Sequence, residues 1–147
     1  MPGRVCVDAS LAIMWLFPER YTSSALAIRR AWLDQAVELI APPVFRPEVT
    51  SAIRLAVYRG DVSSEDGGRA LDRALNWQVF ITEDSDDLQR QSYGIATEYG
   101  RPRAYDAQYL SVAQSEGCDF WTGDERLINS LRGELPWVKW IGDYQPA

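Results

Sequence analysis

The chain has 147 residues, of which 46% are hydrophobic and 24% are charged, a balance typical of one folded domain with a buried core. Its formal net charge of −6 excludes broad electrostatic binding of nucleic acid, because unspecific attraction to phosphates needs a basic surface. The absence of histidine excludes a Ser-His-Asp triad, a Cys-His pair and every histidine-based zinc site. Acid–base or hard-metal chemistry therefore depends on aspartate and glutamate.

The first third of the chain predicts strands that alternate with helices. The β-rich run 5–7 predicts a strand, and the apolar residues 9–17 predict a buried helix that ends before Pro18. Apolar residues at roughly helical spacing predict a second helix over 22–35. Residues 37–41 then predict a strand that two prolines end.

The middle of the chain continues this alternation. An amphipathic helix with Glu48 in its first turn is predicted to end near Gly60, because apolar residues recur at i, i+3, i+4, i+7 and i+8: Val49, Ala52, Ile53, Ala56 and Val57. A helix start at 63–66 opens the next helix, which runs to Leu75, and residues 79–82 predict a third strand.

The last third predicts three helices and two strands. The helices are expected over 88–99, from Tyr105 to Gly117 and over 127–131, and the strands over 120–122 and 138–141. No repeat interrupts the pattern, and short strands between helices imply right-handed βαβ crossovers. The fold class predicted is therefore α/β with a parallel sheet.

Four carboxylates lie where a strand ends or a helix begins: Asp8, Glu48, Asp106 and Asp124. Asp8 and Asp124 follow predicted strands, and ligands of parallel sheets bind outside the carboxyl ends of the strands. Glu48 and Asp106 share a helix face with mostly small or apolar residues, so both should point inward. Each acid alone fits a helix cap or a helix-dipole partner, and only the combination predicts a site.

Four carboxylates at one edge would repel one another unless protons or a divalent cation offset their charge. Mg²⁺ and Mn²⁺ prefer oxygen ligands, lower the pKa of bound water and stabilise a phosphodiester transition state. The acids therefore predict metal-dependent phosphodiester hydrolysis. Ser10 and Thr122 are candidates for holding the carboxylates or a bound water, although ordinary backbone hydrogen bonds explain them equally well.

The acids occur in four stretches: Val7-Asp8-Ala9-Ser10, Pro47-Glu48-Val49, Tyr105-Asp106-Ala107-Gln108-Tyr109-Leu110 and Thr122-Gly123-Asp124-Glu125-Arg126-Leu127. In this order, on a βα alternation, they resemble the motifs of PIN-domain ribonucleases, and their spacing is similar to that of VapC-type toxins. The resemblance covers nearly the whole chain. It implies that residues 1–147 form a single PIN domain, a three-layer sandwich whose parallel sheet of about five strands is flanked by helices.

The resemblance also implies a function. It implies the toxin component of a toxin–antitoxin pair, a homodimeric endoribonuclease that depends on Mg²⁺ or Mn²⁺, cleaves RNA and is inhibited by a small cognate antitoxin protein. On this resemblance Asp8, Glu48, Asp106 and Asp124 would bind the metal and position the attacking water, with Asp8 and Asp106 as the direct ligands. Many relatives have Asn three residues after the glutamate, where this chain has Ser51, so the residue that supports the metal or substrate differs.

Arginines within three residues of the acids are candidates for binding RNA phosphates: Arg46, Arg103 and Arg126. Isolated arginines are, however, commonly solvated surface residues. The acidic stretch 83–87 is explained by capping of the helix that follows it, so we expect no catalytic role there.

Alternatives to the ribonuclease differ in what they require. A noncatalytic PIN-like protein-interaction domain would use the acids as helix caps, and Ser51 favours it modestly. A phosphoacceptor receiver domain would need adjacent acids after the first strand, where Asp8 is followed by Ala9. A nucleotide-binding phosphate loop would need a glycine-rich stretch ending in lysine, and the single lysine is Lys139.

The expected location is cytoplasmic. Cys6 and Cys118 lie in or beside short apolar runs, as reduced, buried cysteines do. The sequence begins without a signal-peptide pattern, and its longest apolar stretch, 11–17, is too short to span a bilayer. We therefore expect a protein of a reducing compartment with no membrane insertion.

Overall fold

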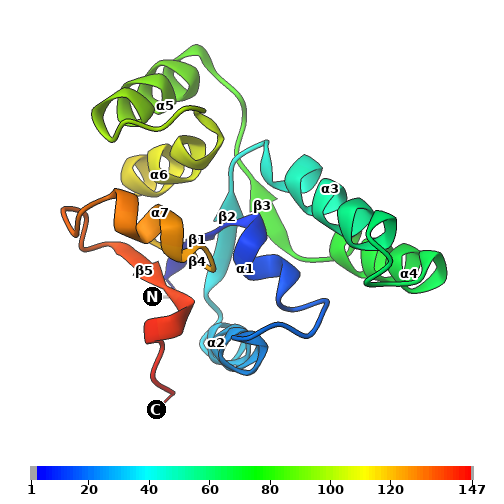
Figure 1. Cartoon of the computed structure of the whole chain (residues 1–147). Coiled ribbons are helices and arrows are strands. Elements are labelled where there is room, and N and C mark those ends of the chain that lie inside the picture. The colour runs from blue at the N-terminus through cyan, green and yellow to red at the C-terminus, as the bar shows by residue number, and fades with distance from the viewer. Residues whose placement is uncertain (1–2, 147) are drawn as a thin grey trace.

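The computed structural model describes residues 3–146 and has one parallel sheet at its centre (Figure 1). The strands lie in the order β3-β2-β1-β4-β5, and every neighbouring pair is parallel. Their bounds are β1 (Arg4–Val7), β2 (Glu38–Ala41), β3 (Val79–Ile81), β4 (Asp119–Thr122) and β5 (Val138–Trp140). The predicted α/β class and parallel sheet are confirmed.

Helices lie on both sides of this sheet, with α5 and α6 on one side and α1 and α2 on the other, so the fold is a three-layer sandwich (Figure 1). The helices are α1 (Ala9–Ile13), α2 (Thr22–Asp34), α3 (Phe45–Tyr58), α4 (Ser64–Leu75), α5 (Asp86–Glu98), α6 (Tyr105–Glu116) and α7 (Glu125–Ser130), and a 3₁₀ turn, η1 (Ile141–Asp143), follows β5. Except for α1, the predicted helix bounds agree with these to within a few residues.

Strand β1 is the centre of the sheet, and its position explains its composition. Val5, Cys6 and Val7 are all buried, as expected for a strand covered on both faces. Cys6 pairs in register with Ile40 of β2 and Phe120 of β4. Because these strands run the same way, residue 8 leaves the sheet beside residue 122, in the middle of the carboxyl edge.

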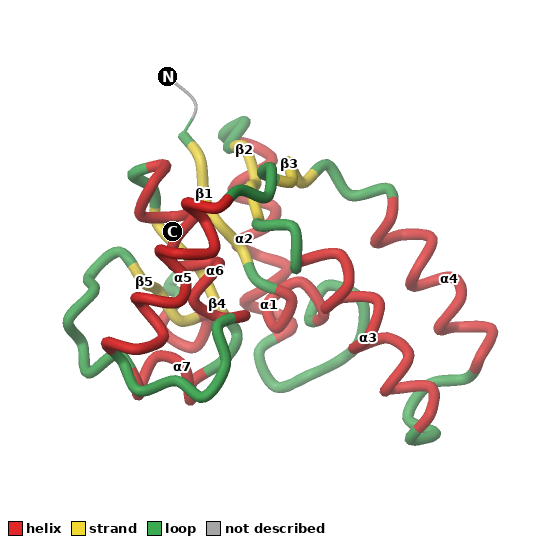
Figure 2. Tube along the Cα trace, turned by 90° about the horizontal axis from the view of Figure 1, so that it is seen from above, coloured by secondary structure: helices red, strands yellow, loops and turns green. Residues whose placement is uncertain are grey.

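Helices α3 and α4 pack side by side, on the opposite side of the molecule from α7 and β5 (Figure 2). Their close approach depends on Gly67, which is buried. A Cβ atom at this position would lie 2.4 Å from the Cγ2 atom of Val57 in α3. A glycine therefore lets the two helix backbones approach.

The predicted helix over 9–17 is too long. Helix α1 ends at Ile13, and the backbone N–H groups of Met14 and Trp15 donate to carbonyls three residues back, which tightens the chain into turns. The Trp15 side chain sets this path, since its indole N–H donates to the Ala25 carbonyl at 3.0 Å and its ring meets Trp77 edge to face at 5.3 Å. Tertiary contacts of one tryptophan thus override helix propensity.

Two further expectations concern caps and cysteines. Ser85 accepts a hydrogen bond from the Leu88 amide, with Asp86 and Asp87 in the first turn of α5, which confirms the capping explanation of the acidic stretch. Cys6 is buried and Cys118 half-buried, and both are free thiols.

Within residues 3–146, no helix combines the length and apolarity that a membrane crossing requires.

Candidate active site

Asp8 is the central carboxylate of the carboxyl edge. It follows β1, caps α1 and is only 5% exposed. One oxygen accepts from the Leu11 amide at 3.0 Å and from the Ser10 hydroxyl at 2.7 Å, and the other accepts from the Thr122 hydroxyl. Three donors from two elements therefore fix the orientation of this carboxylate.

Burial nevertheless makes the charge on Asp8 expensive. Desolvation raises the pKa of Asp8 from an ordinary 3.8 to about 6, although the three hydrogen bonds lower it. The charge of Asp106 is a smaller part of the same rise. Asp8 is thus an oriented carboxylate whose ionised form lacks sufficient compensation, which is the electrostatic setting that a cation relieves.

The Ser10 and Thr122 hydroxyls, which donate to Asp8, also join α1 to the loop between β4 and α7. The Gly123 amide donates to the Ser10 hydroxyl at 2.9 Å, and the Asp124 amide donates to the Thr122 hydroxyl at 3.0 Å. A Cβ atom on Gly123 would lie 2.7 Å from the Cε atom of Met14 and 3.0 Å from the Ser10 carbonyl oxygen. The structure thus brings Ser10 and Thr122, both expected from the sequence, to the carboxylate.

We expect Thr122→Val to lower the free energy of unfolding at pH 7.5 by about 2 kcal/mol, because a hydrogen bond to a charged group contributes about 1.5–3 kcal/mol. The valine matches the threonine in shape but leaves one Asp8 oxygen without its donor. Urea unfolding of the metal-free protein measures the change, and Thr122→Ser, which keeps the hydroxyl, is the control. Equal stability of the valine variant and the wild type would contradict the role of this donor.

Glu48 lies in the first turn of α3, half-buried, and accepts a hydrogen bond of 2.5 Å from the Tyr109 hydroxyl of α6. Burial raises the pKa of Glu48, the hydrogen bond from Tyr109 lowers it, and the charge of Asp106 raises it. Tyr109 is 1% exposed and stacks on Phe120 with ring centroids 5.8 Å apart. Burial and the charge of Glu48 hold the pKa of Tyr109 far above its usual range, so its hydroxyl stays protonated and donates.

Asp106 lies in the first turn of α6 and forms an ion pair with Arg101, whose Nη2 atom is 2.9 Å from its Oδ2 atom. The side chains are 34% and 23% exposed, respectively. The charge of Asp106 raises the pKa of both Asp8 and Glu48. Three acids that lie far apart in the sequence are therefore electrostatic neighbours, as the sequence predicted.

Asp124 lies beside this group, but its carboxylate caps the N-terminus of α7. One oxygen accepts from the amides of Arg126 at 2.9 Å and Leu127 at 3.4 Å, which is the N-cap geometry that the sequence allowed as an alternative. The backbone amide of Asp124, and not its carboxylate, donates to the Thr122 hydroxyl, which in turn donates to Asp8. Among the residues that the structure describes, no three acids lie close enough to form a complete metal-ligand set.

The chemistry of the donor set still fits Mg²⁺ or Mn²⁺. Every candidate ligand is a carboxylate oxygen, with hydroxyl oxygens beside it, and hard divalent cations prefer such ligands. Each of the three neighbouring acids is held by a hydrogen-bond or ion-pair partner: Asp8 by Thr122, Glu48 by Tyr109 and Asp106 by Arg101. Burial and, in addition, the charge of Asp106 raise the pKa of Asp8 and Glu48, and a bound cation would favour the ionised form of both acids.

The other candidates from the sequence lie outside this network. Ser51 is exposed on α3, and no hydrogen bond joins its hydroxyl to another residue in the described part of the chain. Arg46, Arg103 and Arg126 are exposed, and none of them forms an ion pair within residues 3–146. The three arginine side chains are therefore open to solvent, and they lie near the acids in sequence.

Sequence reasoning did not give Tyr109 or Arg101 a role at the site. Tyr109 carries a detectable signal, because it lies three residues after Asp106 and so on the same side of α6. Arg101 lies in the loop before α6, where no periodicity predicts the direction of a side chain. Both are long polar side chains that reach an acid only through tertiary packing.

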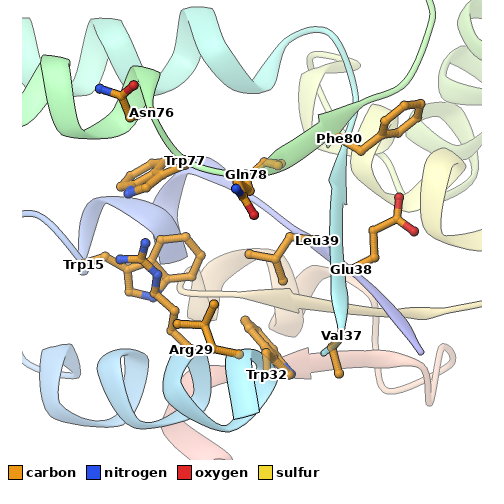
Figure 3. A pocket seen from close by; sticks show the side chains of 12 residues that line it. Trp15, Arg29, Trp32, Val37, Glu38, Leu39, Asn76, Trp77, Gln78 and Phe80 are labelled. Carbon is orange, nitrogen blue, oxygen red and sulfur yellow. The ribbon is translucent and has the colours of Figure 1, made fainter. Parts of the chain in front are cut away.

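A pocket of about 600 Å³ lies away from these acids (Figure 3). It is lined at the amino ends of β2 and β3, and the Arg29 guanidinium lies over the rings of Trp15 and Trp77, at 4.9 and 5.8 Å from their centroids. None of the four candidate acids lines it. The chemistry of the four acids, and not this pocket, therefore marks the candidate site.

No sequence-family model matches the chain, and no curated protein matches it. Solved structures do. VapC20 of Mycobacterium tuberculosis, described as a sarcin-ricin-loop-cleaving toxin, superposes with a TM-score of 0.61 at 15% identity, over 86% of this chain and 94% of that one. A toxin–antitoxin complex from Klebsiella pneumoniae gives 0.64 at 17% identity, over 97% and 98%, respectively. VapBC2 of Rickettsia felis, bound to a promoter DNA fragment, gives 0.62 at 12%, over 93% and 96%.

The chain has the PIN-domain fold of VapC-type toxins. Identities of 12–17% establish this fold and not an activity. In this PIN-domain fold the carboxyl edge of β1 and β4 carries Asp8 and Asp124, and the first turns of α3 and α6 bring Glu48 and Asp106 to the same region.

Proposed function

We propose that this protein is the toxin of a toxin–antitoxin pair, an endoribonuclease that hydrolyses RNA phosphodiester bonds with Mg²⁺ or Mn²⁺. The observation that carries the proposal is the group Asp8, Glu48 and Asp106, three carboxylates from three elements: burial raises the pKa of Asp8 and Glu48, and the charge of Asp106 adds to both shifts. A protein retains such a costly group at the carboxyl edge of a parallel sheet where a ligand offsets the charge.

The residues divide the work as follows. Asp8 and Asp106 would bind the metal directly, and Ser10 and Thr122 keep the oxygens of Asp8 oriented. A bound divalent ion would supply water of lowered pKa and stabilise charge on the scissile phosphate. Glu48, held by Tyr109 at one oxygen, has a raised pKa and is suited to accept a proton from the attacking water. Asp124 would take part less directly, since its carboxylate caps α7 and only its backbone amide bonds to Thr122.

The similar structures support the choice of substrate and partner. VapC20 is described as cleaving the sarcin-ricin loop, and the Klebsiella protein is described in a toxin–antitoxin complex. By analogy of fold we propose RNA as the substrate and a small antitoxin protein as the partner. The homodimer that the resemblance implies and the cytoplasmic location expected from the cysteines and the apolar pattern stay predictions.

Cleavage of RNA by the purified protein tests the proposal. Wild-type protein incubated with a pool of structured RNAs and Mn²⁺ should produce discrete fragments, and chelation of the metal with EDTA should stop their formation. Glu48→Gln, which keeps the shape and an acceptor for Tyr109, should lose cleavage while still folding. Fragments that form equally in EDTA, or with Glu48→Gln at the wild-type rate, would contradict the proposed activity.

One observation favours a second candidate, a noncatalytic PIN-like protein-interaction domain. Asp8 and Asp124 both cap helices, and the described residues offer no ready set of three metal-binding acids. This candidate predicts no calorimetric signal for Mn²⁺ at millimolar concentration with folded wild-type protein. It does not explain why burial holds the pKa of Asp8 near 6 beside two more acids.

Arg103 provides a prediction about RNA. It is exposed, three residues before Asp106, and forms no ion pair with other described residues. We expect Arg103→Ala to weaken RNA binding several-fold, by loss of a phosphate contact, and to leave Mn²⁺ affinity unchanged. Fluorescence anisotropy with a labelled RNA measures the first and calorimetry the second. Unchanged RNA binding would remove Arg103 from the RNA surface.

A further inference from the structure

Arg101 places a positively charged side chain in the candidate site. Its Nη2 atom lies 2.9 Å from the Oδ2 atom of Asp106, and its side chain is 23% exposed. Its Nε atom is buried and finds no hydrogen-bond partner among residues 3–146. The guanidinium therefore holds Asp106 through a single contact and not through the paired contacts that make arginine–carboxylate bonds strong.

The position of this charge matters because of its partner. The charge of Asp106 adds to the burial that raises the pKa of both Asp8 and Glu48, so Asp106 is an electrostatic neighbour of both acids. Arg101 neutralises that acid without reaching the other two, as no hydrogen bond or ion pair joins it to Asp8 or Glu48 in the described residues. A divalent cation that binds Asp106 would compete with Arg101 for the Oδ2 atom and would be repelled by the positive charge of the guanidinium.

We propose that Arg101 is a built-in competitor of the metal: it holds Asp106 in the metal-free protein, and a divalent cation must displace it or share Asp106 with it. Arg101 is thus a positioning residue that sets the metal affinity of this site. The proposal rests on the metal-dependent function proposed above.

Calorimetric titration with Mn²⁺ alone, without RNA, tests this role in wild type, Arg101→Gln and Arg101→Lys, with each fold checked by circular dichroism. Removing the positive charge should tighten Mn²⁺ binding about tenfold in Arg101→Gln, because like charges a few ångströms apart at a partly buried site repel appreciably. Arg101→Lys keeps the charge and should stay within about threefold of wild type. A merely structural arginine would predict weaker binding in both variants.

Arg103→Gln is the matched control. It makes the same substitution two residues after Arg101, at an arginine that is exposed and forms no ion pair in the described chain. Its Mn²⁺ affinity should change less than twofold. Mn²⁺ binding by wild type with equal or weaker binding by folded Arg101→Gln overturns the competition and leaves the metal-dependent function standing. No Mn²⁺ binding by wild type or any variant overturns both, since removing a competitor would then expose no site.

Discussion

Asp106→Asn is expected to weaken Mn²⁺ binding at least about a hundredfold, since even residues that only support a metal ligand contribute roughly ten- to a hundredfold in affinity. The amide keeps the shape of the side chain but removes the charge. Because that charge raises the pKa of Asp8 and Glu48, both values should fall in the variant. Calorimetry with Mn²⁺ measures the affinity, and NMR titration of the carboxyl carbons measures the pKa changes.

Asp72→Asn is the matched control for this experiment. It makes the same change at an exposed aspartate in α4, outside the candidate site. Its Mn²⁺ affinity and the pKa of Asp8 should equal those of wild type. Retention of wild-type Mn²⁺ affinity by Asp106→Asn would remove this residue from the metal site. Loss of affinity in both variants would instead indicate unspecific attraction of the cation to an acidic surface.

Asp8→Asn is expected to stabilise the metal-free protein at pH 7.5 by up to about 3 kcal/mol, although it removes a proposed metal ligand. The pKa of Asp8 lies near 6 in the folded state and near 3.8 when the residue is unperturbed, so folding favours its protonated form. One pKa unit corresponds to about 1.4 kcal/mol, and about two units therefore give a penalty of this size once Asp8 is ionised. The neutral amide does not incur this penalty.

The pH dependence has a defined sign. The stability that protonated Asp8 contributes is fully present below pH 4 and is lost as the pH rises toward 6, so the stability advantage of Asp8→Asn should grow over that interval and stay constant above it. Urea unfolding of both proteins from pH 4 to 8 measures this difference. Asp72→Asn should stay within about 0.5 kcal/mol of wild type at each pH.

Addition of Mn²⁺ should reverse the order of the two proteins. Binding of a cation to the folded state alone stabilises wild type by mass action, while Asp8→Asn gains little. A variant that is less stable than wild type at pH 7.5 without metal, by an amount independent of pH, would show that the three donors compensate the charge fully. It would also show that the pKa of Asp8 is not raised.

The order and type of nearly every helix and strand could be predicted, because apolar periodicity is a local property of the sequence. The short buried run at 5–7 and the stripe from Val49 to Val57 predicted a strand and a helix that the structure contains. Helix α1 was the exception, since the indole contacts of Trp15 with Ala25 and Trp77 end it early. Such contacts join residues that no local pattern relates.

The candidate site divides in the same way. The proximity of Asp8, Glu48 and Asp106 could be predicted, since parallel strands place their carboxyl ends at one edge and helix faces fix which residues point inward. The use of Asp124 as a cap of α7 and the exposure of Ser51 depend on the exact path of a loop and the rotation of a helix. Residue spacing does not predict the path of a loop or the rotation of a helix to within an ångström.

The sequence by itself determined the α/β class, the parallel sheet and the absence of histidine chemistry, since composition and hydrophobic periodicity can be read from the residues without knowledge of the fold. Tertiary structure alone decided that Tyr109 holds Glu48 and that Arg101 holds Asp106. These pairs form between long or loop-borne side chains whose direction depends on packing against other elements. Charge compensation in this site is therefore a property of the folded chain and not of any single motif.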